Sequence, residues 1–325
     1  MRVQFNLHTA LTAWNMSAFP LFVLVLVVLV AAWYLRADWQ LALRGRRWKP
    51  SRTLSFLAGL LVIDLAFQSP DATLAMSYFQ AHVIQHLMLM VLAPPLLALG
   101  APSTLLLQTA SRRTKQRWLA VLRSPVFAAI SHPVTVWFLY FGVMFAFFLT
   151  PLINVAMHHM DLMDLLNVVF LFGGTLYWWP MVGIDPIMHW KMSYGMRLLN
   201  LLVGSGIEAF LGVAILAASH PIASMYTLGS THSGGALLWV TTEVSTLGGF
   251  LPIYIQWSRS EHRAGLRADT HAAERAAQLA PVAAASLRDT AGRARPAASA
   301  WEAAWLAKYG HLPGGTVADP TAGSS

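Results

Sequence analysis

Hydrophobic positions in this chain recur in long, almost unbroken runs that short polar connections separate. Each run has about 20 residues, the length that an α-helix needs to cross the hydrocarbon core of a bilayer. We expect seven such spans, at residues 18–35, 53–69, 78–99, 133–150, 165–183, 198–217 and 236–257. The pattern therefore predicts an all-α, polytopic membrane bundle of seven transmembrane helices.

The chain after the last apolar run is a different kind of sequence. It is rich in Ala, with Gly, Pro and scattered Arg and Glu. We therefore divide the chain into a transmembrane domain at 1–257 and a flexible, largely disordered tail at 258–325. Within the tail we expect short helices at 268–280 and at 298–309. The second of these would place Trp301, Trp305 and Tyr309 on one face.

Composition supports the membrane assignment and removes some chemistry. The chain is 56% hydrophobic and only 11% charged, whereas roughly a quarter of the residues in a soluble domain are charged. It has no cysteine. Disulfides and thiolate metal ligands are therefore excluded.

The basic residues predict how the bundle is oriented. They are concentrated in the connections 36–52 and 100–132, and the connection after the fifth span carries Lys191 and Arg197. The other three connections carry no Lys or Arg. By the positive-inside rule, the N-terminus should lie outside and the C-terminal tail in the cytoplasm. The net charge of +8 thus indicates topology, and we expect no nucleic-acid partner.

The third span carries the first candidate chemistry. His82 and His86 are four residues apart, so both imidazoles leave the same face of a helix. Met90 continues that face one turn deeper. Pro94 and Pro95 then remove backbone donors and predict a kink or break. Two histidines on one helix cannot bind opposite faces of one haem, so a metal ion held from one side is favoured.

A second group of candidate ligands lies in the predicted outer loop before the fifth span: Met157, His158, His159 and Met160. Imidazole and thioether together suit Cu(I), and they stay usable in an oxidising compartment. Methionine is also a common flexible filler of protein cores. Metal binding and plain packing therefore both remain open for this patch.

Three acids fall inside predicted spans: Asp64, Glu208 and Glu243. An ionisable group in the bilayer core is costly and usually functional. Glu208 lies in the small-residue run 204–209, which lets helices approach closely, so we expect it to face protein. Each acid could hydrogen-bond a metal ligand without contacting the ion itself, or it could simply hydrogen-bond a neighbouring helix.

The stretch from His82-Val-Ile-Gln-His86 through Pro94-Pro95 to Pro102 resembles CtaG-type cytochrome c oxidase assembly factors. The block Leu-Tyr-Trp-Trp-Pro-Met-Val-Gly-Ile-Asp-Pro at 176–186 agrees, and so, more weakly, does Gly234-Gly235 with Glu243. The resemblance covers about residues 18–257. It implies a seven-span bundle of the bacterial cytoplasmic (inner) membrane that helps to assemble haem–copper oxidases.

Relatives in this family tend to carry further histidines in the fifth span, where this chain has Asn167 and Val169. A complete family metal site therefore does not follow from the resemblance alone.

Together these observations predict an assembly factor that binds or positions Cu(I) on the outer side of the membrane for delivery to an oxidase. His82 and His86 would anchor the ion, with Met90 and the 157–160 patch as further ligands. A copper or proton transporter, and a metal-free scaffold for a nascent oxidase subunit, are the alternatives. We expect oxidase subunits and the lipid bilayer as partners, leave a homodimer open, and predict that the protein is not an enzyme.

Overall fold

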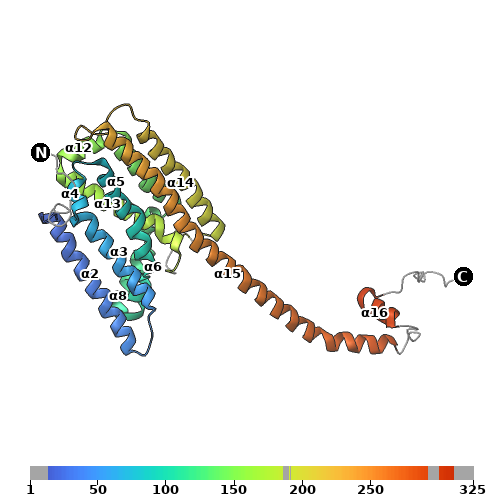
Figure 1. Ribbon diagram of the computed structural model, residues 1–325. Coiled ribbons are helices and arrows are strands. Elements are labelled where there is room, and N and C mark those ends of the chain that lie inside the picture. The colour runs from blue at the N-terminus through green and yellow to red at the C-terminus, as the bar shows by residue number, and fades with distance from the viewer. Residues whose placement is uncertain (1–13, 186–189, 191, 292–299, 311–325) are drawn as a thin grey trace. The chain divides into compact units, whose positions relative to one another are not determined.

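A computed structural model describes residues 14–185, 190, 192–291 and 300–310 of the chain. The chain forms two compact units, Met1–Trp257 and Ser258–Ser325. Every regular element in the described part is a helix, and Figure 1 shows their arrangement within each unit. The elements are α2 Ala18–Leu43, α3 Pro50–Gln68, α4 Pro70–Leu74, α5 Phe79–Leu87, η1 Met88–Leu92, α6 Ala93–Leu99, α7 Pro102–Thr109, α8 Arg112–Leu122, α9 Pro125–Ile130, α10 Pro133–Trp137, η2 Phe138–Gly142, α11 Val143–Leu149, α12 Leu152–His158, α13 Met160–Val182, α14 Tyr194–Leu216, α15 Leu228–Ala291 and α16 Ala300–Tyr309.

Six helical stretches among the described residues are long and apolar enough to cross a bilayer: Ala18–Leu43, Pro50–Leu74, Phe79–Thr109, Met160–Val182, Tyr194–Leu216 and Leu228–Ala280. The span expected at 133–150 is the helix Pro133–Leu149, which reaches the necessary length only together with Leu152–His158, at a bend of 78°. The fold thus has six candidate spans, or seven if the bent pair crosses as one. The helical membrane class is confirmed, whereas seven spans and their orientation stay predictions.

The predicted break in the third span is present and has a specific form. The α-helix α5 ends at Leu87, a π-helical turn follows as η1, and α-helix resumes at Ala93. The backbone N–H of Ala93 donates to the carbonyl of Met88, five residues earlier. Pro94 has no N–H to offer the carbonyl of Met90 four residues earlier. The π turn lets the helix continue past the two prolines, which have no backbone N–H to donate.

Helix α13 packs tightly against that π turn. A Cβ on Gly174 would lie 2.7 Å from the carbonyl oxygen of Met90 and 2.9 Å from its Cα. Backbone atoms cannot move aside as a flexible side chain can, so only glycine allows this approach. The fifth and third spans are thereby fixed to one another at Met90.

The chain just after the third span also meets the segment that ends at Asp185. Thr104, in the first turn of α7, donates its backbone N–H to Asp185 Oδ1 at 2.9 Å, and its hydroxyl donates to the same oxygen. The carboxylate therefore caps the N-terminus of α7 from a distant segment. Just before α7, Ala101 has the left-handed φ of 49°, and the Tyr34 hydroxyl donates to the Gly100 carbonyl at 2.7 Å.

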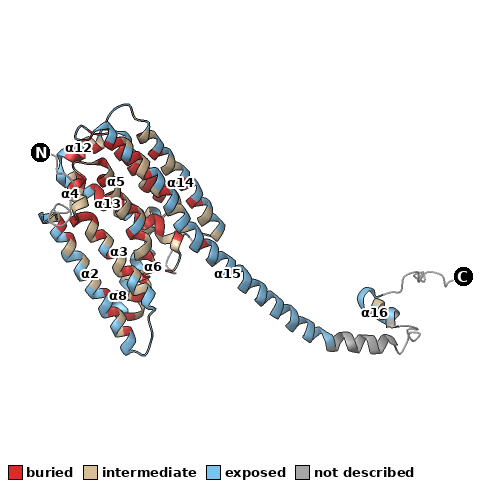
Figure 2. Ribbon diagram, in the orientation of Figure 1, coloured by how far each residue is buried: buried red, intermediate tan, exposed pale blue. Residues whose placement is uncertain are grey.

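Buried side chains concentrate inside the first unit, around α5 and α13, as Figure 2 shows. The largest core cluster joins residues of α5, η1, η2, α11, α12, α13 and α14. Large apolar side chains on α2 and on the first part of α15 are exposed instead. Such surfaces suit lipid contact, since a membrane helix needs no polar outer face.

In the second unit the structure has more helix than the sequence pattern predicts. Helix α15 continues to Ala291, where only a short helix at 268–280 was expected. The Ala-rich composition explains this, because Ala has the highest helix propensity. In α16 the stripe forms as its spacing predicts, with ring centroids of Trp301 and Trp305 5.4 Å apart and those of Trp305 and Tyr309 4.5 Å apart.

The contact at Met90 predicts that Gly174→Ala lowers stability. An added methyl must push apart two backbones, at an expected cost of about 1–3 kcal/mol. Gly206→Ala is the matched control, since a Cβ there would meet nothing within 4 Å. Thermal unfolding of both variants in detergent checks this, and equal midpoints for the two would contradict it.

The cap at Thr104 predicts a pH dependence. Burial raises the pKa of the Asp185 carboxyl above its ordinary value, and the hydrogen bonds from Thr104 oppose that rise. Because the folded state then holds the proton more tightly, the carboxyl's contribution to stability is greatest at acid pH and falls as pH rises through the folded-state pKa. Asp185→Asn keeps an Oδ1 acceptor but does not titrate. Its melting temperature relative to wild type should therefore rise between pH 4 and pH 7, and a constant difference would refute the assignment.

Candidate intramembrane metal site

The histidine pair lies on α5, with His86 in its last turn, and is almost fully buried, with His82 1% and His86 4% exposed. The two Nε2 atoms face each other at 2.8 Å, as the four-residue spacing predicts. In a neutral pair one Nε2 must donate and the other accept. To bind one cation, both Nε2 lone pairs must instead face the ion, with both ring protons on Nδ1.

Aromatic rings enclose the pair. The ring of Phe147 stacks on His82 with centroids 5.5 Å apart, and Phe170 meets His86 edge-on at 4.4 Å. Within the described residues, neither Nδ1 atom has a hydrogen-bond partner. Buried polar atoms are usually partnered, so the two unpartnered Nδ1 atoms make this pair the candidate metal site of the bundle.

Met90 reaches the same place from the π turn. A small cavity of about 10 Å³ beside His86 is lined by Met90, Met144, Tyr140 and Glu208 among others. Its volume is close to that of one water-sized probe. The cavity thus brings together three residues of the sequence prediction, His86, Met90 and Glu208, and it adds Met144 from α11. His82 contacts His86 but does not line the cavity.

Glu208 faces protein, as its small-residue surroundings predict. It lies on α14, partly buried, and its carboxyl hydrogen-bonds with Tyr140 and Thr242. The ring of Tyr140 stacks on Tyr177, with centroids 4.3 Å apart and planes 15° from parallel. A second cavity of about 20 Å³, lined by Tyr140, Tyr177, Glu208 and Ser245 among others, continues from the first.

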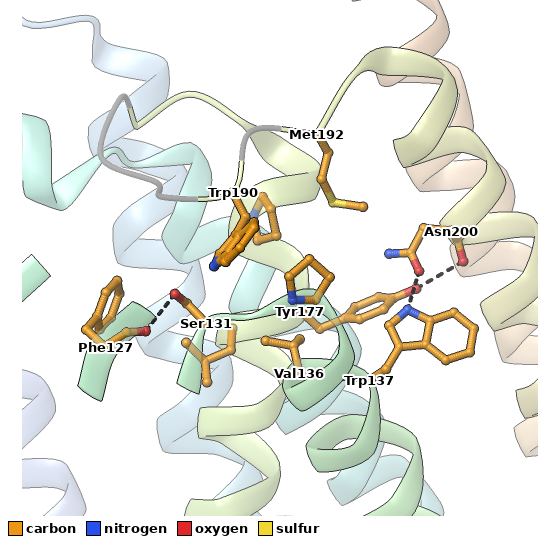
Figure 3. A pocket seen from close by; sticks show the side chains of 11 residues that line it. Phe127, Ser131, Val136, Trp137, Tyr177, Trp190, Met192 and Asn200 are labelled. Atoms are coloured by element: carbon orange, nitrogen blue, oxygen red, sulfur yellow. Dashed lines mark hydrogen bonds between the residues drawn. The ribbon is translucent and has the colours of Figure 1, made fainter. Parts of the chain in front are cut away.

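Tyr177 also lines a further pocket, which Figure 3 shows. There Trp137 Nε1 donates to Asn200 Oδ1 at 2.6 Å, and the Tyr177 hydroxyl donates to the Asn200 backbone carbonyl at 3.4 Å. These bonds tie α10, α13 and α14 together. The pocket contains none of the predicted site residues.

The sequence reasoning missed both tyrosines and Met144. Tyr140 lies in the π turn η2, and Met144 follows it by four residues in α11. That spacing is the one signal that pointed to them, because it places both on one helical face. In a span that is apolar throughout, these neutral side chains give no sequence signal of a functional role.

The four residues of the predicted patch at 157–160 do not share one environment in the structure. Met157 is buried in the main core cluster, because α12 turns it inward. His158, His159 and Met160 are exposed, and His158 Nδ1 lies 2.6 Å from the Asn154 carbonyl oxygen.

The other two predicted acids also lie outside the cavities beside His86. Asp64 on α3 is partly buried, with no partner for Oδ1 among the described residues. Glu243 is exposed on α15. Asn167 is buried on α13, and its Oδ1 likewise has no partner in this part of the chain.

The described residues contain no cluster of three or more His, Cys, Asp or Glu side chains able to hold a metal ion. A fuller ligand set around the histidine pair must therefore draw on thioethers. Met90 and Met144 are the sulfur donors that line the cavity beside His86.

These features define an all-helical bundle, with six candidate membrane spans among the described residues, that encloses a histidine, methionine and glutamate cluster. The family model for cytochrome c oxidase caa3 assembly factors matches residues 32–260, and the chain belongs to this family.

Three curated relatives, all named as uncharacterized proteins, are similar to the chain. The one from Mycobacterium leprae (strain TN) is 28% identical over 246 residues, which is 70% of this chain and 37% of the relative. Those from Mycobacterium bovis and Mycobacterium tuberculosis are each 27% identical over 263 residues, or 75% of this chain and 40% of the relative. The chain thus spans about two fifths of the length of these relatives. No solved structure matches it.

The hydrogen bonds of Glu208 predict how its variants behave. Glu208→Gln keeps an oxygen acceptor for the Tyr140 hydroxyl and offers an N–H donor to Thr242, whose own hydroxyl donates to the Leu238 carbonyl at 2.8 Å. The protein should therefore accumulate and melt close to wild type. Glu208→Leu removes that acceptor, and an unsatisfied buried hydroxyl costs about 1–3 kcal/mol. Melting temperatures of both variants in detergent test this. Equal loss in the two would show that the carboxylate itself is required for the fold.

Proposed function

We propose that this protein assists oxidase assembly by capturing Cu(I) between His82 and His86 inside the bundle and passing it to an oxidase subunit. The observation that carries the proposal is the pair of Nε2 atoms, 2.8 Å apart in an aromatic cage. Membership of the caa3 assembly factor family supports the assembly role. Family membership also favours a non-catalytic role.

The chemistry of the donors favours Cu(I). Imidazole nitrogens and thioether sulfurs are neutral, soft to intermediate ligands, which suit a monovalent copper ion. A divalent ion would bring more charge into the same apolar cage, and an uncompensated buried charge is costly. Zinc also binds thioether poorly, so the sulfur atoms of Met90 and Met144 add selectivity.

The site has the character of a transfer site. Two nitrogen donors and one or two thioethers are a small ligand set, and no carboxylate buttresses either ring at Nδ1. Metal-binding histidines usually have such a partner, which raises their affinity. Its absence among the described residues suits a protein that must release its cargo.

The Lys and Arg distribution supports the orientation that this function needs. It predicts that the histidine pair on α5 lies in the outer half of a bacterial cytoplasmic membrane. Copper would then enter and leave from the outer side.

A second function is supported by the cavities. Those lined by His86, Glu208 and Ser245 adjoin each other within the bundle. A copper or proton transporter would use such a series of cavities that carry a histidine and a glutamate. Flux measured in vesicles separates transport from simple capture.

The proposal predicts that the purified protein binds one Cu(I). His82→Ala or His86→Ala should weaken this binding by about 100-fold, the upper end of the loss seen when a hydrogen-bond partner of a metal ligand is removed. The double variant should be no weaker than either single one, because the pair acts as one chelate. His158→Ala with His159→Ala is the matched control and should bind as wild type. Anaerobic competition with a Cu(I) chelator provides the measurement.

In cells, the single histidine variants should leave the oxidase short of copper at low external metal, with partial recovery when copper is added. Full metallation of the oxidase by the double variant would reject the copper role. The metal-free scaffold would then be the better explanation.

A further inference from the structure

Two connections of the first unit carry many cations and no acid. Residues 39–52, which end α2 and lead into α3, contain no Asp or Glu, and neither do residues 100–132, which include α7, α8 and α9. We call the exposed cations around the end of α2 and the start of α8 the basic surface. Its members are Arg44, Arg46, Arg47, Arg112, Arg113 and Arg117.

A pair of hydrogen bonds joins the two connections into one surface. The guanidinium of Arg44, just after α2, donates to the backbone carbonyls of Gln108 and Thr109, at 3.1 Å each. Thr109 is the last residue of α7 and precedes Arg112 by three residues. The end of α2 and the start of α8 therefore lie together at one end of the bundle (Figure 1).

The carboxylates close to this surface have other partners. Asp38, six residues before Arg44 on α2, accepts a hydrogen bond from the Thr53 hydroxyl at 2.9 Å. Asp185 caps α7 through Thr104. No carboxylate among the described residues forms an ion pair with a cation of the basic surface. The surface therefore has the charge that attracts an anion from outside the chain.

Helix α8 itself carries a local conflict that an anion would relieve. Arg112 and Arg113 stand in its first turn, which contains no acid. Cations there oppose the helix dipole, whose positive end lies at the N-terminus. Arg113 and Arg117 are one turn apart and both exposed, whereas Leu122 is buried. The helix thus turns its apolar side toward the protein and its guanidinium groups outward.

An exposed apolar stripe on α2 leads to the same place. Leu35, Trp39 and Leu43 are four residues apart, so they share one face of the helix. They are 45%, 64% and 68% exposed, and the stripe ends one residue before Arg44. It lies on a candidate membrane span, and it is roughly 12 Å long at the α-helical rise. A ligand that covers both features needs an anionic head and an apolar chain.

We propose that the basic surface and the α2 stripe together bind an anionic phospholipid. Its phosphate lies against the guanidinium groups, and one acyl chain lies along Leu35, Trp39 and Leu43. This site is separate from the histidine pair, and the inference does not depend on the copper function.

Charge and apolar contact together select this ligand. A nucleic acid or an acidic soluble protein would neutralise the cations but leave the α2 stripe uncovered. A lipid without net charge would cover the stripe but leave the cations without a counter-ion. Anionic headgroups attract clusters of Lys and Arg that lie next to membrane spans, and a guanidinium pairs well with phosphate.

The test uses the full chain, purified and delipidated in a neutral detergent, and measures lipid binding by native mass spectrometry. Phosphatidylglycerol should bind about tenfold more tightly than phosphatidylcholine with the same acyl chains, because only the first carries a net negative charge. Inorganic phosphate at the same concentration should not displace it, because phosphate has no chain to cover the stripe. Equal affinity for the two lipids, or displacement by phosphate, overturns the proposal.

A triple variant, Arg112→Gln with Arg113→Gln and Arg117→Gln, should lose about fivefold in phosphatidylglycerol affinity for each cation removed. The same three positions changed to Lys should keep most of the affinity, because the charge remains. An affinity equal to that of wild type in the Gln variant refutes the site. So does an equal loss in the Gln and Lys variants, because it would show that the altered fold and not the charge is responsible.

The matched control removes three exposed cations of the second unit and should bind as wild type; these are Arg263, Arg267 and Arg275. A loss as large as that of the first triple variant would reduce the effect to net charge and overturn the proposal. On the apolar side, Trp39→Gln with Leu43→Gln should also weaken binding. Leu202→Gln with Phe210→Gln, at positions similarly exposed on α14, should not. Equal effects of these two pairs would exclude the α2 stripe from the site.

Discussion

The contact between Gly174 and the backbone of Met90 is the constraint on which the site depends. In a bilayer every backbone polar group must be satisfied within the protein. Pro94 and Pro95 leave carbonyls of the third span without their usual donors, so an irregular turn there has to be buried against another helix. Glycine at 174 lets α13 cover it. The same contact fixes Met90 beside His86.

The order of the spans and the histidine geometry follow from the sequence for clear physical reasons. Apolar length identifies membrane helices, and a spacing of four residues aligns two imidazoles whatever the surroundings. The Pro-Pro pair likewise predicts a break. The exact form of that break, a π turn at Met88–Leu92, depends on the packing of α13 and is not contained in the third span itself.

The sequence does not show which face of each membrane span points into the bundle. In a soluble helix the polar face marks solvent, but a membrane span is apolar toward both lipid and protein. Nothing local therefore shows that Met157 points into the core while Met160, three residues later, is exposed. The same lack of contrast hides Tyr140 and Met144, whose importance comes only from the residues that face them across the bundle.

The two glutamates of the last spans show how far the usual rule for intramembrane acids reaches. Both lie in apolar runs, and both count as functional by the cost of burying an ionisable group. Glu208 meets that cost inside the chain, through Tyr140 and Thr242. Glu243 meets it nowhere in the described residues, and its neighbours are exposed apolar side chains. One rule thus covers two different situations. Glu208 is partnered inside the bundle, beside the candidate metal ligands, whereas Glu243 has no partner among the described residues.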